Sequence, residues 1–209
     1  VDNLRKEGVP DEKIHLVGNV MIDTLLKHRA RAEESTVLKD LKVDRGPYAV
    51  VTLHRPSNVD NAETLGGIFS ALEEIGKDMP VIFPIHPRTR QRLTSFGINN
   101  NKSVRLLDPL GYLDFLKLTS AAKIVLTDSG GIQEEATILK VPCLTLRDNT
   151  ERPVTVQVGA NRLVGSEPAR ILDAYNRIRN GAGAEAAIPP FWDGHAAERI
   201  VEIIETRLN

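Results

Sequence analysis

The stretch KIVLTDSGGIQEEA, residues 123–136, joins a short β-branched run to a pair of glycines and then to a segment of helical character. Residues 123–127 are typical of a buried strand, and the apolar spacing of residues 132–140 predicts a helix. Two glycines at the junction leave the backbone open to close approach, and the unpaired N–H groups of a first helical turn favour a phosphate. The stretch therefore predicts a strand–turn–helix unit of an α/β fold, with an anion site at the turn.

The polar residues of this stretch allow two interpretations. In the first, the Ser129 hydroxyl and the backbone of Gly130 and Gly131 bind phosphate, and a carboxylate one turn further on accepts hydrogen bonds from ribose hydroxyls. Adjacent helical side chains point about 100° apart, so Glu134 and Glu135 cannot both face one ligand. In the second, Asp or Ser merely caps the helix, the glycines form the turn, and both glutamates face solvent.

The alternation of short apolar runs and helical periodicity extends along the whole chain. It predicts a parallel sheet with helices on both faces, a Rossmann-like α/β fold, and one domain over residues 1–209. The predicted strands are 14–18, 48–54, 81–85, 104–107, 123–127 and 142–146, with a further strand-like stretch near 162–164. The predicted helices are 20–34, 62–77, 88–96, 112–120, 132–140, 168–180 and 194–208, the last following an irregular GAGAEAAIPPFW segment.

Composition excludes some classes of function. The 209 residues carry a formal net charge of −1, which gives no diffuse positive field for nucleic acid or an anionic membrane. No apolar run approaches the ~20 residues that span a bilayer, so we expect a cytoplasmic protein. Cys143, the single cysteine, lies in an apolar run and is expected to be buried and inert. The spacing of potential ligands indicates no metal, and we expect no cofactor.

Two further strand ends carry basic residues. In VVTLHRPSN, residues 50–58, His54 and Arg55 follow a predicted strand, where a bound diphosphate would place its charge. Alternatively, the histidine caps the strand and the arginine forms a surface ion pair. In FPIHPRTR, residues 83–90, we favour ligand contact only for His86. Pro87 suits a first helical turn, and the arginines beyond it suit a solvated helix start.

Two more segments could complete a binding site. In LRDNTERP, residues 146–153, Thr150, Glu151 and Arg152 could position a sugar, or the last two could form an ordinary loop pair. In GYLDFLK, residues 111–117, Tyr112 and Phe115 lie three residues apart and share a helix face. One of them could cover a uracil ring, although we expect Tyr112 to pack in the core.

Taken together, VGNVMIDTL (17–25), VVTLHRPSN, PIHPRTR, YLDF, TDSGGIQEEA and LRDNTERP occur in the order seen in the C-terminal domain of non-hydrolysing UDP-N-acetylglucosamine 2-epimerases. The resemblance covers about residues 7–164. It implies the C-terminal half of a GT-B enzyme, in which two Rossmann-like domains close on a nucleotide sugar. That family interconverts UDP-N-acetylglucosamine and UDP-N-acetylmannosamine. The resemblance also implies a homodimer and a role in cell-surface polysaccharide biosynthesis.

The resemblance implies a role for individual residues. Ser129, Gly130 and Gly131 would bind the diphosphate, and Glu135 would bind the ribose. Phe115 would lie on the uracil side, and His54 would lie at the reacting centre. Arg55 would contact the substrate, and Thr150, Glu151 and Arg152 would contact the sugar. His86 would contact a second, regulatory UDP-N-acetylglucosamine. The chain departs from the family where HRPSN replaces the commoner HRREN and TERPVT replaces TERPE. These departures put the finer substrate preference and the regulatory site in doubt.

The chemistry of such an enzyme shapes our remaining expectations. Expelling UDP from C1 with loss of the C2 proton is easier than deprotonating C2 directly, and the step needs carboxylates that the family carries mostly on its N-terminal domain. The chain lacks an initial Met, which suggests a missing upstream part. We therefore expect it to bind UDP but not to epimerise alone, with helix 194–208 packing on the missing domain. The alternatives are a hydrolysing epimerase, a GT-B glycosyltransferase or a non-catalytic nucleotide-sugar-binding module.

Overall fold

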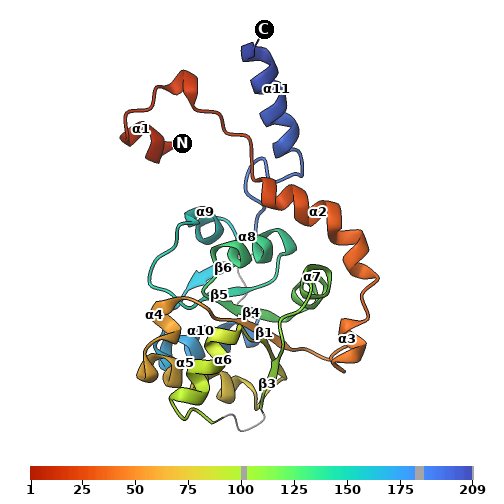
Figure 1. The fold of residues 1–209 in the computed structure, drawn as a ribbon, viewed down its shortest axis with the longest axis vertical. Coiled ribbons are helices and arrows are strands. Elements are labelled where there is room, and N and C mark those ends of the chain that lie inside the picture. The colour runs from red at the N-terminus through yellow and green to blue at the C-terminus, as the bar shows by residue number, and fades with distance from the viewer. Residues whose placement is uncertain (100–102, 182–185, 209) are drawn as a thin grey trace.

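The computed structural model describes residues 1–99, 103–181 and 186–208, which form a parallel sheet covered by helices on both faces (Figure 1). The strand order is β3-β2-β1-β4-β5-β6, with every neighbouring pair parallel. This is the order of Rossmann-type sheets, and the predicted fold class is confirmed. The strands are β1 (Ala49–Thr52), β2 (Val81–Pro84), β3 (Val104–Leu107), β4 (Ile124–Thr127), β5 (Cys143–Thr145) and β6 (Asn161–Leu163).

Helices on the two faces bury alternate residues of the strands. One apolar cluster joins Ala49 and Val51 of β1 to helix α5 (Ala62–Ile75), and another joins Val50 to helix α7 (Tyr112–Ser120). This alternation is what a strand with two covered faces requires. The helices are α1 (Asp2–Lys6), α2 (Val20–Glu33), α3 (Val37–Asp40), α4 (Pro56–Val59), α5 (Ala62–Ile75), α6 (Pro87–Ser95), α7 (Tyr112–Ser120), α8 (Gly130–Leu139), α9 (Pro153–Gln157), α10 (Pro168–Arg179) and α11 (Ala196–Leu208).

The strand predicted at residues 14–18 is wrong. This segment follows the 3₁₀ turn η1 (Asp11–Lys13) and lies outside the sheet, on the way to α2, and within the described chain it pairs with no strand (Figure 1). Leu16 at its centre is exposed, so its apolar pattern was mistaken for that of a buried strand. The sixth strand is instead β6, at the short stretch predicted near 162–164.

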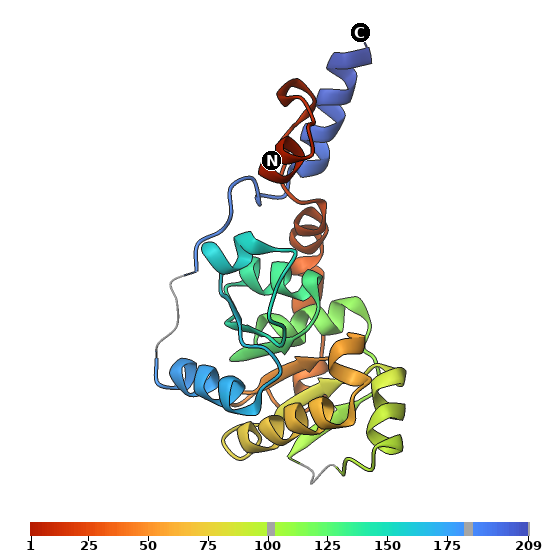
Figure 2. The same cartoon turned by 90° about the vertical axis from the view of Figure 1, so that its left-hand side faces the viewer.

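The segments that lead to the two ends of the chain meet beside helix α2, and both ends project away from the sheet (Figure 2). The Asp23 carboxylate accepts hydrogen bonds from the backbone N–H groups of Ala196 (3.2 Å) and Ala197 (2.8 Å), and so caps α11. Gly18 adopts φ +107°, and a Cβ there would lie 2.2 Å from the Phe191 carbonyl oxygen. This close approach thus requires glycine. Of the irregular segment predicted at 181–192, residues 182–185 lie outside the described residues.

Burial of Cys143 is confirmed, and it raises the pKa of the thiol to about 12. A thiol with so high a pKa is not nucleophilic near neutral pH. Among the described residues, none of the helices has the length and apolarity needed to cross a membrane.

Candidate functional site

The candidate site lies at the carboxyl ends of β1, β4 and β5. The strand order reverses between β1 and β4, and in open α/β sheets ligands bind at such a point. The loop after β1 and the loop after β5 are joined there, because Asn58 Nδ2 donates a hydrogen bond to the Leu146 carbonyl oxygen at 2.9 Å. Beneath them, the Thr52 and Thr127 hydroxyls lie 2.6 Å apart. The strand ends therefore form one continuous polar edge.

Asp128, directly after β4, organises the loop that carries His54. Its side chain is 0% exposed. Its carboxylate accepts hydrogen bonds from the backbone N–H groups of His54 and Arg55 and from Asn58 Nδ2, at 2.9–3.2 Å. The His54 imidazole Nδ1 lies 2.9 Å from Asp128 Oδ1. Asp128 directly follows the predicted strand 123–127, but this role was not predicted, although the position of Asp128 before SGG was a signal.

The N-terminus of α8 is open, as an anion site requires. Ser129 occupies the N-cap position, yet its hydroxyl makes no capping hydrogen bond to any described residue of the helix. At Gly130, a Cβ would meet no atom closer than those of the Arg152 side chain, 3.9 Å away. The interpretation of Ser129 as a simple helix cap therefore lacks its hydrogen bond, and the Gly130 position in the first turn of α8 is open beside the Arg152 cation, whereas Met21 covers the Gly131 position.

Both glutamates of α8 are buried, so the predicted alternative of solvent-facing glutamates is wrong. Glu134 forms an ion pair with Arg152, with Oε1 2.7 Å from Nε. Glu135, 7% exposed, has its pKa raised to about 7 by burial and, secondly, by the charge of Glu134. The Oε2 atoms of both carboxylates have no hydrogen-bond partner among the described residues. Because an unpaired buried carboxylate oxygen is costly, these two oxygens lack the compensation that a hydrogen-bond donor would supply.

The loop after β5 is held by charged and amide side chains. Glu151 accepts two hydrogen bonds from the Arg147 guanidinium, at 2.7 and 2.8 Å, and lies 3.7 Å from Arg55. These contacts lower the pKa of Glu151 to about 2, with the hydrogen bonds from Arg147 as the largest cause. Because Arg152 pairs with Glu134, the predicted Glu151–Arg152 side-chain pair is wrong.

Thr150 is anchored by a residue that sequence analysis did not select. Its hydroxyl donates a hydrogen bond to Gln133 Oε1 at 2.6 Å, and Gln133, which is fully buried, also accepts from Asn161 Nδ2 at 3.2 Å. This network links helix α8, strand β6 and the loop after β5. A glutamine on a helix gives no sequence signal of such a role, because most glutamines are exposed.

The aromatic residues of α7 differ in burial. Tyr112 is 41% exposed, so the expectation that it packs in the core is wrong. It is the first residue of the helix, and the chain N-terminal to it is solvent-exposed, which leaves its ring at the rim. Phe115, one turn later, is partly buried against the cluster that contains Tyr48 and Val50.

His86 has a structural role at the start of α6. It is the N-cap of α6, where its Nδ1 accepts a hydrogen bond from the Arg88 backbone N–H at 3.2 Å, and Pro87 occupies the first turn as expected. Arg88 pairs with Asp60, and Arg90 pairs with Asp108 at 3.0 Å. These exposed pairs fit the expected solvated helix start.

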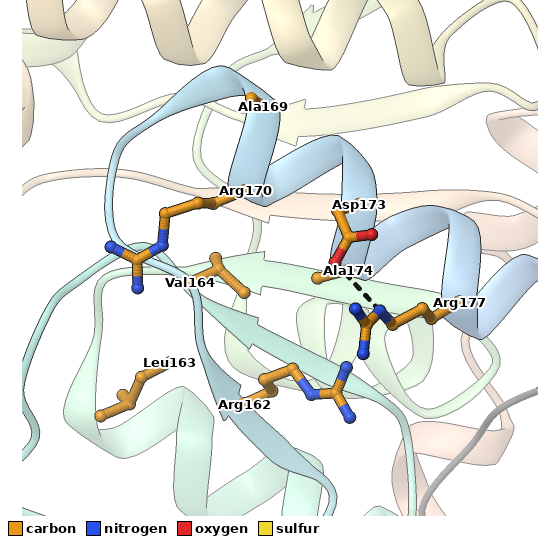
Figure 3. A pocket seen from close by; sticks show the side chains of 8 residues that line it. All are labelled: Arg162, Leu163, Val164, Ala169, Arg170, Asp173, Ala174 and Arg177. Carbon is orange, nitrogen blue, oxygen red and sulfur yellow. Dashed lines mark ion pairs between the residues drawn. The ribbon is translucent and has the colours of Figure 1, made fainter.

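Two cavities help to place the site. One of about 270 Å³ lies between the loops after β1 and β5, and is lined by Arg55, Ser57, Asn58, Leu146, Arg147, Asp148, Asn149 and Ser166. Another of about 520 Å³ lies between β6 and α10 (Figure 3), and is lined by Arg162, Leu163, Val164, Ala169, Arg170, Asp173, Ala174 and Arg177. The lining of the larger cavity includes none of the predicted site residues. In the described ranges, no group of three or more His, Cys, Asp or Glu residues is placed to hold a metal ion.

The fold and this edge define a class: a Rossmann-like domain with a polar site at the carboxyl ends of its strands. The chain belongs to the UDP-N-acetylglucosamine 2-epimerase family, whose model matches residues 1–205. It is 44% identical to UDP-N-acetylglucosamine 2-epimerase of Methanocaldococcus jannaschii, over 97% of this chain and 57% of that protein. It is 37% identical to UDP-2,3-diacetamido-2,3-dideoxy-D-glucuronate 2-epimerase of Pseudomonas aeruginosa, over 98% of this chain and 56% of that protein.

Solved structures agree with this assignment. The crystal structure of the Methanocaldococcus jannaschii UDP-GlcNAc 2-epimerase in complex with UDP-GlcNAc and UDP matches with a TM-score of 0.84 and 42% identity, over 98% of this chain and 58% of that chain. The fold is thus that of the half-length Rossmann-like domain of a GT-B epimerase, as predicted. The chain spans a little over half the length of the relatives it matches.

Proposed function

We propose that this chain supplies the UDP-binding half of a non-hydrolysing UDP-N-acetylglucosamine 2-epimerase. The observation that carries the proposal is the convergence, at one sheet edge, of an open helix N-terminus, basic side chains and two buried carboxylates with unpaired oxygens. Helix dipole and guanidinium groups favour a diphosphate, and a buried carboxylate favours a pair of ribose hydroxyls. The M. jannaschii relative was crystallised with UDP-GlcNAc and UDP, which supports this choice of ligand.

Each predicted residue takes a role in this proposal. The α8 N-terminus binds the diphosphate through Ser129, Gly130 and Gly131. Glu135 accepts hydrogen bonds from the ribose hydroxyls. Glu134 does not contact the ribose, because it forms an ion pair with Arg152. Phe115 lies on the uracil side. His54 lies at the reacting centre and Arg55 contacts the substrate. Thr150, Glu151 and Arg152 contact the sugar.

The proposed reaction is elimination followed by re-addition. The C2–H and C1–O bonds break, a C1–C2 double bond forms, and UDP leaves with the electron pair of the C1–O bond. UDP then re-adds to C1 while a proton returns to the opposite face of C2. The polar edge stabilises the charge that develops on UDP, so strong diphosphate binding serves the transition state and keeps the intermediate in place.

The proposal includes parts outside this chain. A second Rossmann-like domain would supply the carboxylates that move the C2 proton, and α11, with exposed Val201 and Ile204, would pack against it. We also propose a single domain over residues 1–209, a cytoplasmic homodimer, a regulatory contact at His86, and use of the product in cell-surface polysaccharide synthesis. No metal or other cofactor enters the scheme.

Calorimetry and product analysis test the proposal. The chain alone should bind UDP but leave UDP-N-acetylglucosamine unchanged. Joined to the N-terminal domain that its relatives carry, it should form UDP-N-acetylmannosamine, which proton NMR distinguishes. Free N-acetylmannosamine would indicate the hydrolysing reaction instead, and the diacetamido-glucuronate substrate of the Pseudomonas relative serves as the comparison substrate. Absence of UDP binding by a folded chain would contradict the proposal.

A further inference from the structure

Asp128 is fully buried, so the loss of water around its carboxylate must be compensated by hydrogen bonds. Burying a charged carboxylate costs several kcal/mol unless hydrogen bonds replace its water. Its Oδ2 receives the backbone N–H groups of Arg55 (2.9 Å) and His54 (3.1 Å) and the Asn58 amide (3.2 Å). Its Oδ1 lies 2.9 Å from the His54 imidazole and 3.2 Å from the His54 backbone N–H. The two oxygens therefore share the His54 backbone N–H but otherwise have different partners, and only Oδ1 lies next to the imidazole.

This contact defines the protonation of the imidazole. The contact is an ion-pair distance and not an aligned hydrogen bond, but a lone pair on Nδ1 would be repelled by a carboxylate oxygen 2.9 Å away, so the contact favours a proton on Nδ1. In a neutral ring the proton is then absent from Nε2, which is left as an acceptor. The His54 side chain is 48% exposed, so its outer nitrogen is accessible to a ligand. The partner of one ring nitrogen thus fixes the chemistry of the other.

We propose that Asp128 is a positioning residue that holds His54 in the Nδ1–H tautomer and presents Nε2 to the reacting centre. The proposal rests on the proposed function only in assigning His54 to that centre. When the ring is neutral, Nε2 accepts a hydrogen bond. When the ring is protonated, Nδ1–H still faces Asp128 while Nε2–H donates to an oxygen of the departing diphosphate. Orientation is the same in both states.

The substitution Asp128→Asn distinguishes a role of Asp128 in positioning the His54 ring from a role in supporting the loop alone. The amide oxygen should take the Oδ2 position, since three N–H groups point there. The amide NH₂ then occupies the Oδ1 position and turns its hydrogens toward Nδ1, which favours a lone pair on Nδ1 and the proton on Nε2. The loop keeps most of its hydrogen bonds, while the tautomer of His54 is reversed. A buried Asp→Asn change beside a catalytic histidine lowers turnover in this way in serine proteases, by about 10⁴-fold.

Nitrogen-15 NMR of histidine in the 209-residue chain gives the direct test. In the wild type at a pH where the ring is neutral, we expect His54 to show a protonated Nδ1 and an unprotonated Nε2. In Asp128→Asn the assignment should reverse. A wild-type ring protonated at Nε2, or a tautomer unchanged by the substitution, overturns the inference. The wild-type spectrum alone decides if the variant does not fold.

Kinetics of the two-domain enzyme give an independent test. Asp128→Asn should lower kcat by about 10²-fold or more with KM changed less than about threefold, and it should add nothing to His54→Ala. Losses that multiply in the double variant would mean that Asp128 acts apart from His54, which overturns the inference. Asp173→Asn, an exposed carboxylate on α10, is the matched control and should behave as wild type. A wild-type enzyme without epimerase activity would refute the proposed function, and the NMR result would still decide the tautomer.

Discussion

Two charged regions of this domain differ in how their charges are held. Around Asp128 and the first turns of α8, carboxylates are buried, come from separate elements, and include oxygens without a partner among the described residues. In the larger cavity between β6 and α10, Arg177 pairs with Asp173 one turn away, and both side chains are largely exposed (Figure 3). Water screens the second set but not the first.

This difference shows that cavity size does not mark the site. The β6–α10 cavity is larger, about 520 Å³ against about 270 Å³ for the cavity between the loops after β1 and β5. Exposed ion pairs contribute little, whereas buried carboxylates with free oxygens persist only where the fold compensates for them. Substitutions in the two regions should therefore differ in effect, and the largest loss is expected at His54.

His54→Ala in the two-domain enzyme should lower turnover by about 10²-fold or more, because a positioned histidine contributes on that scale to charge or proton handling. The fold should be unaffected, since the side chain is half exposed. A coupled assay for UDP-N-acetylmannosamine measures the effect. Normal turnover in this variant would remove His54 from the reacting centre.

Glu135 should make stability depend on pH. Its folded pKa of about 7 lies above the ordinary value of 4.5, so between these values the native state keeps a proton that the unfolded chain has released. The free energy of unfolding should therefore fall as pH rises from 4.5 to 7, by roughly 3 kcal/mol from this group. Urea denaturation from pH 4 to 8 measures the fall, and Glu135→Gln should remove it. Parallel curves for the two proteins would contradict a buried, shifted carboxyl.

Ser129→Ala should weaken UDP binding by about fivefold, the equivalent of one neutral hydrogen bond of about 1 kcal/mol. Melting temperature should change little, because the hydroxyl does not cap α8 in the described structure. Calorimetry with UDP measures the affinity. A variant with reduced stability and unchanged affinity would restore the helix-cap interpretation.

Arg177→Ala should have the smallest effect, because its ion pair with Asp173 lies one turn away on the same exposed helix face. UDP affinity should change less than about twofold. The same calorimetric titration is the check. A loss as large as that of Ser129→Ala would show that the β6–α10 region takes part in binding.

The sheet was predictable because its strands are short apolar runs with two buried faces. Predicted strand 104–107 matches β3 at both ends, and predicted helix 112–120 matches α7. The strand prediction for residues 14–18 was wrong because a run of five residues does not show whether a neighbouring strand is present to pair with it. Pairing is a tertiary property.

The candidate site was predictable in its positions but not in its contacts. The places of His54, Ser129 and Arg152 followed from the ends of parallel strands. The Asp128–His54 contact and the Thr150–Gln133 hydrogen bond join residues on different elements, which periodicity cannot reveal. Likewise, the surroundings of Glu134 include Asn19 and those of Gly131 include Met21, so the burial of this part of α8 depends on another segment of the chain and not only on the sequence of α8 itself.

Hydrogen–deuterium exchange of the 209-residue chain, with and without saturating UDP, tests the central claim most directly. Our account predicts slower exchange in residues 54–58, 128–135 and 147–152, and unchanged exchange in residues 162–177 around the larger cavity. Protection centred on 162–177, with residues 128–135 unaffected, would contradict it.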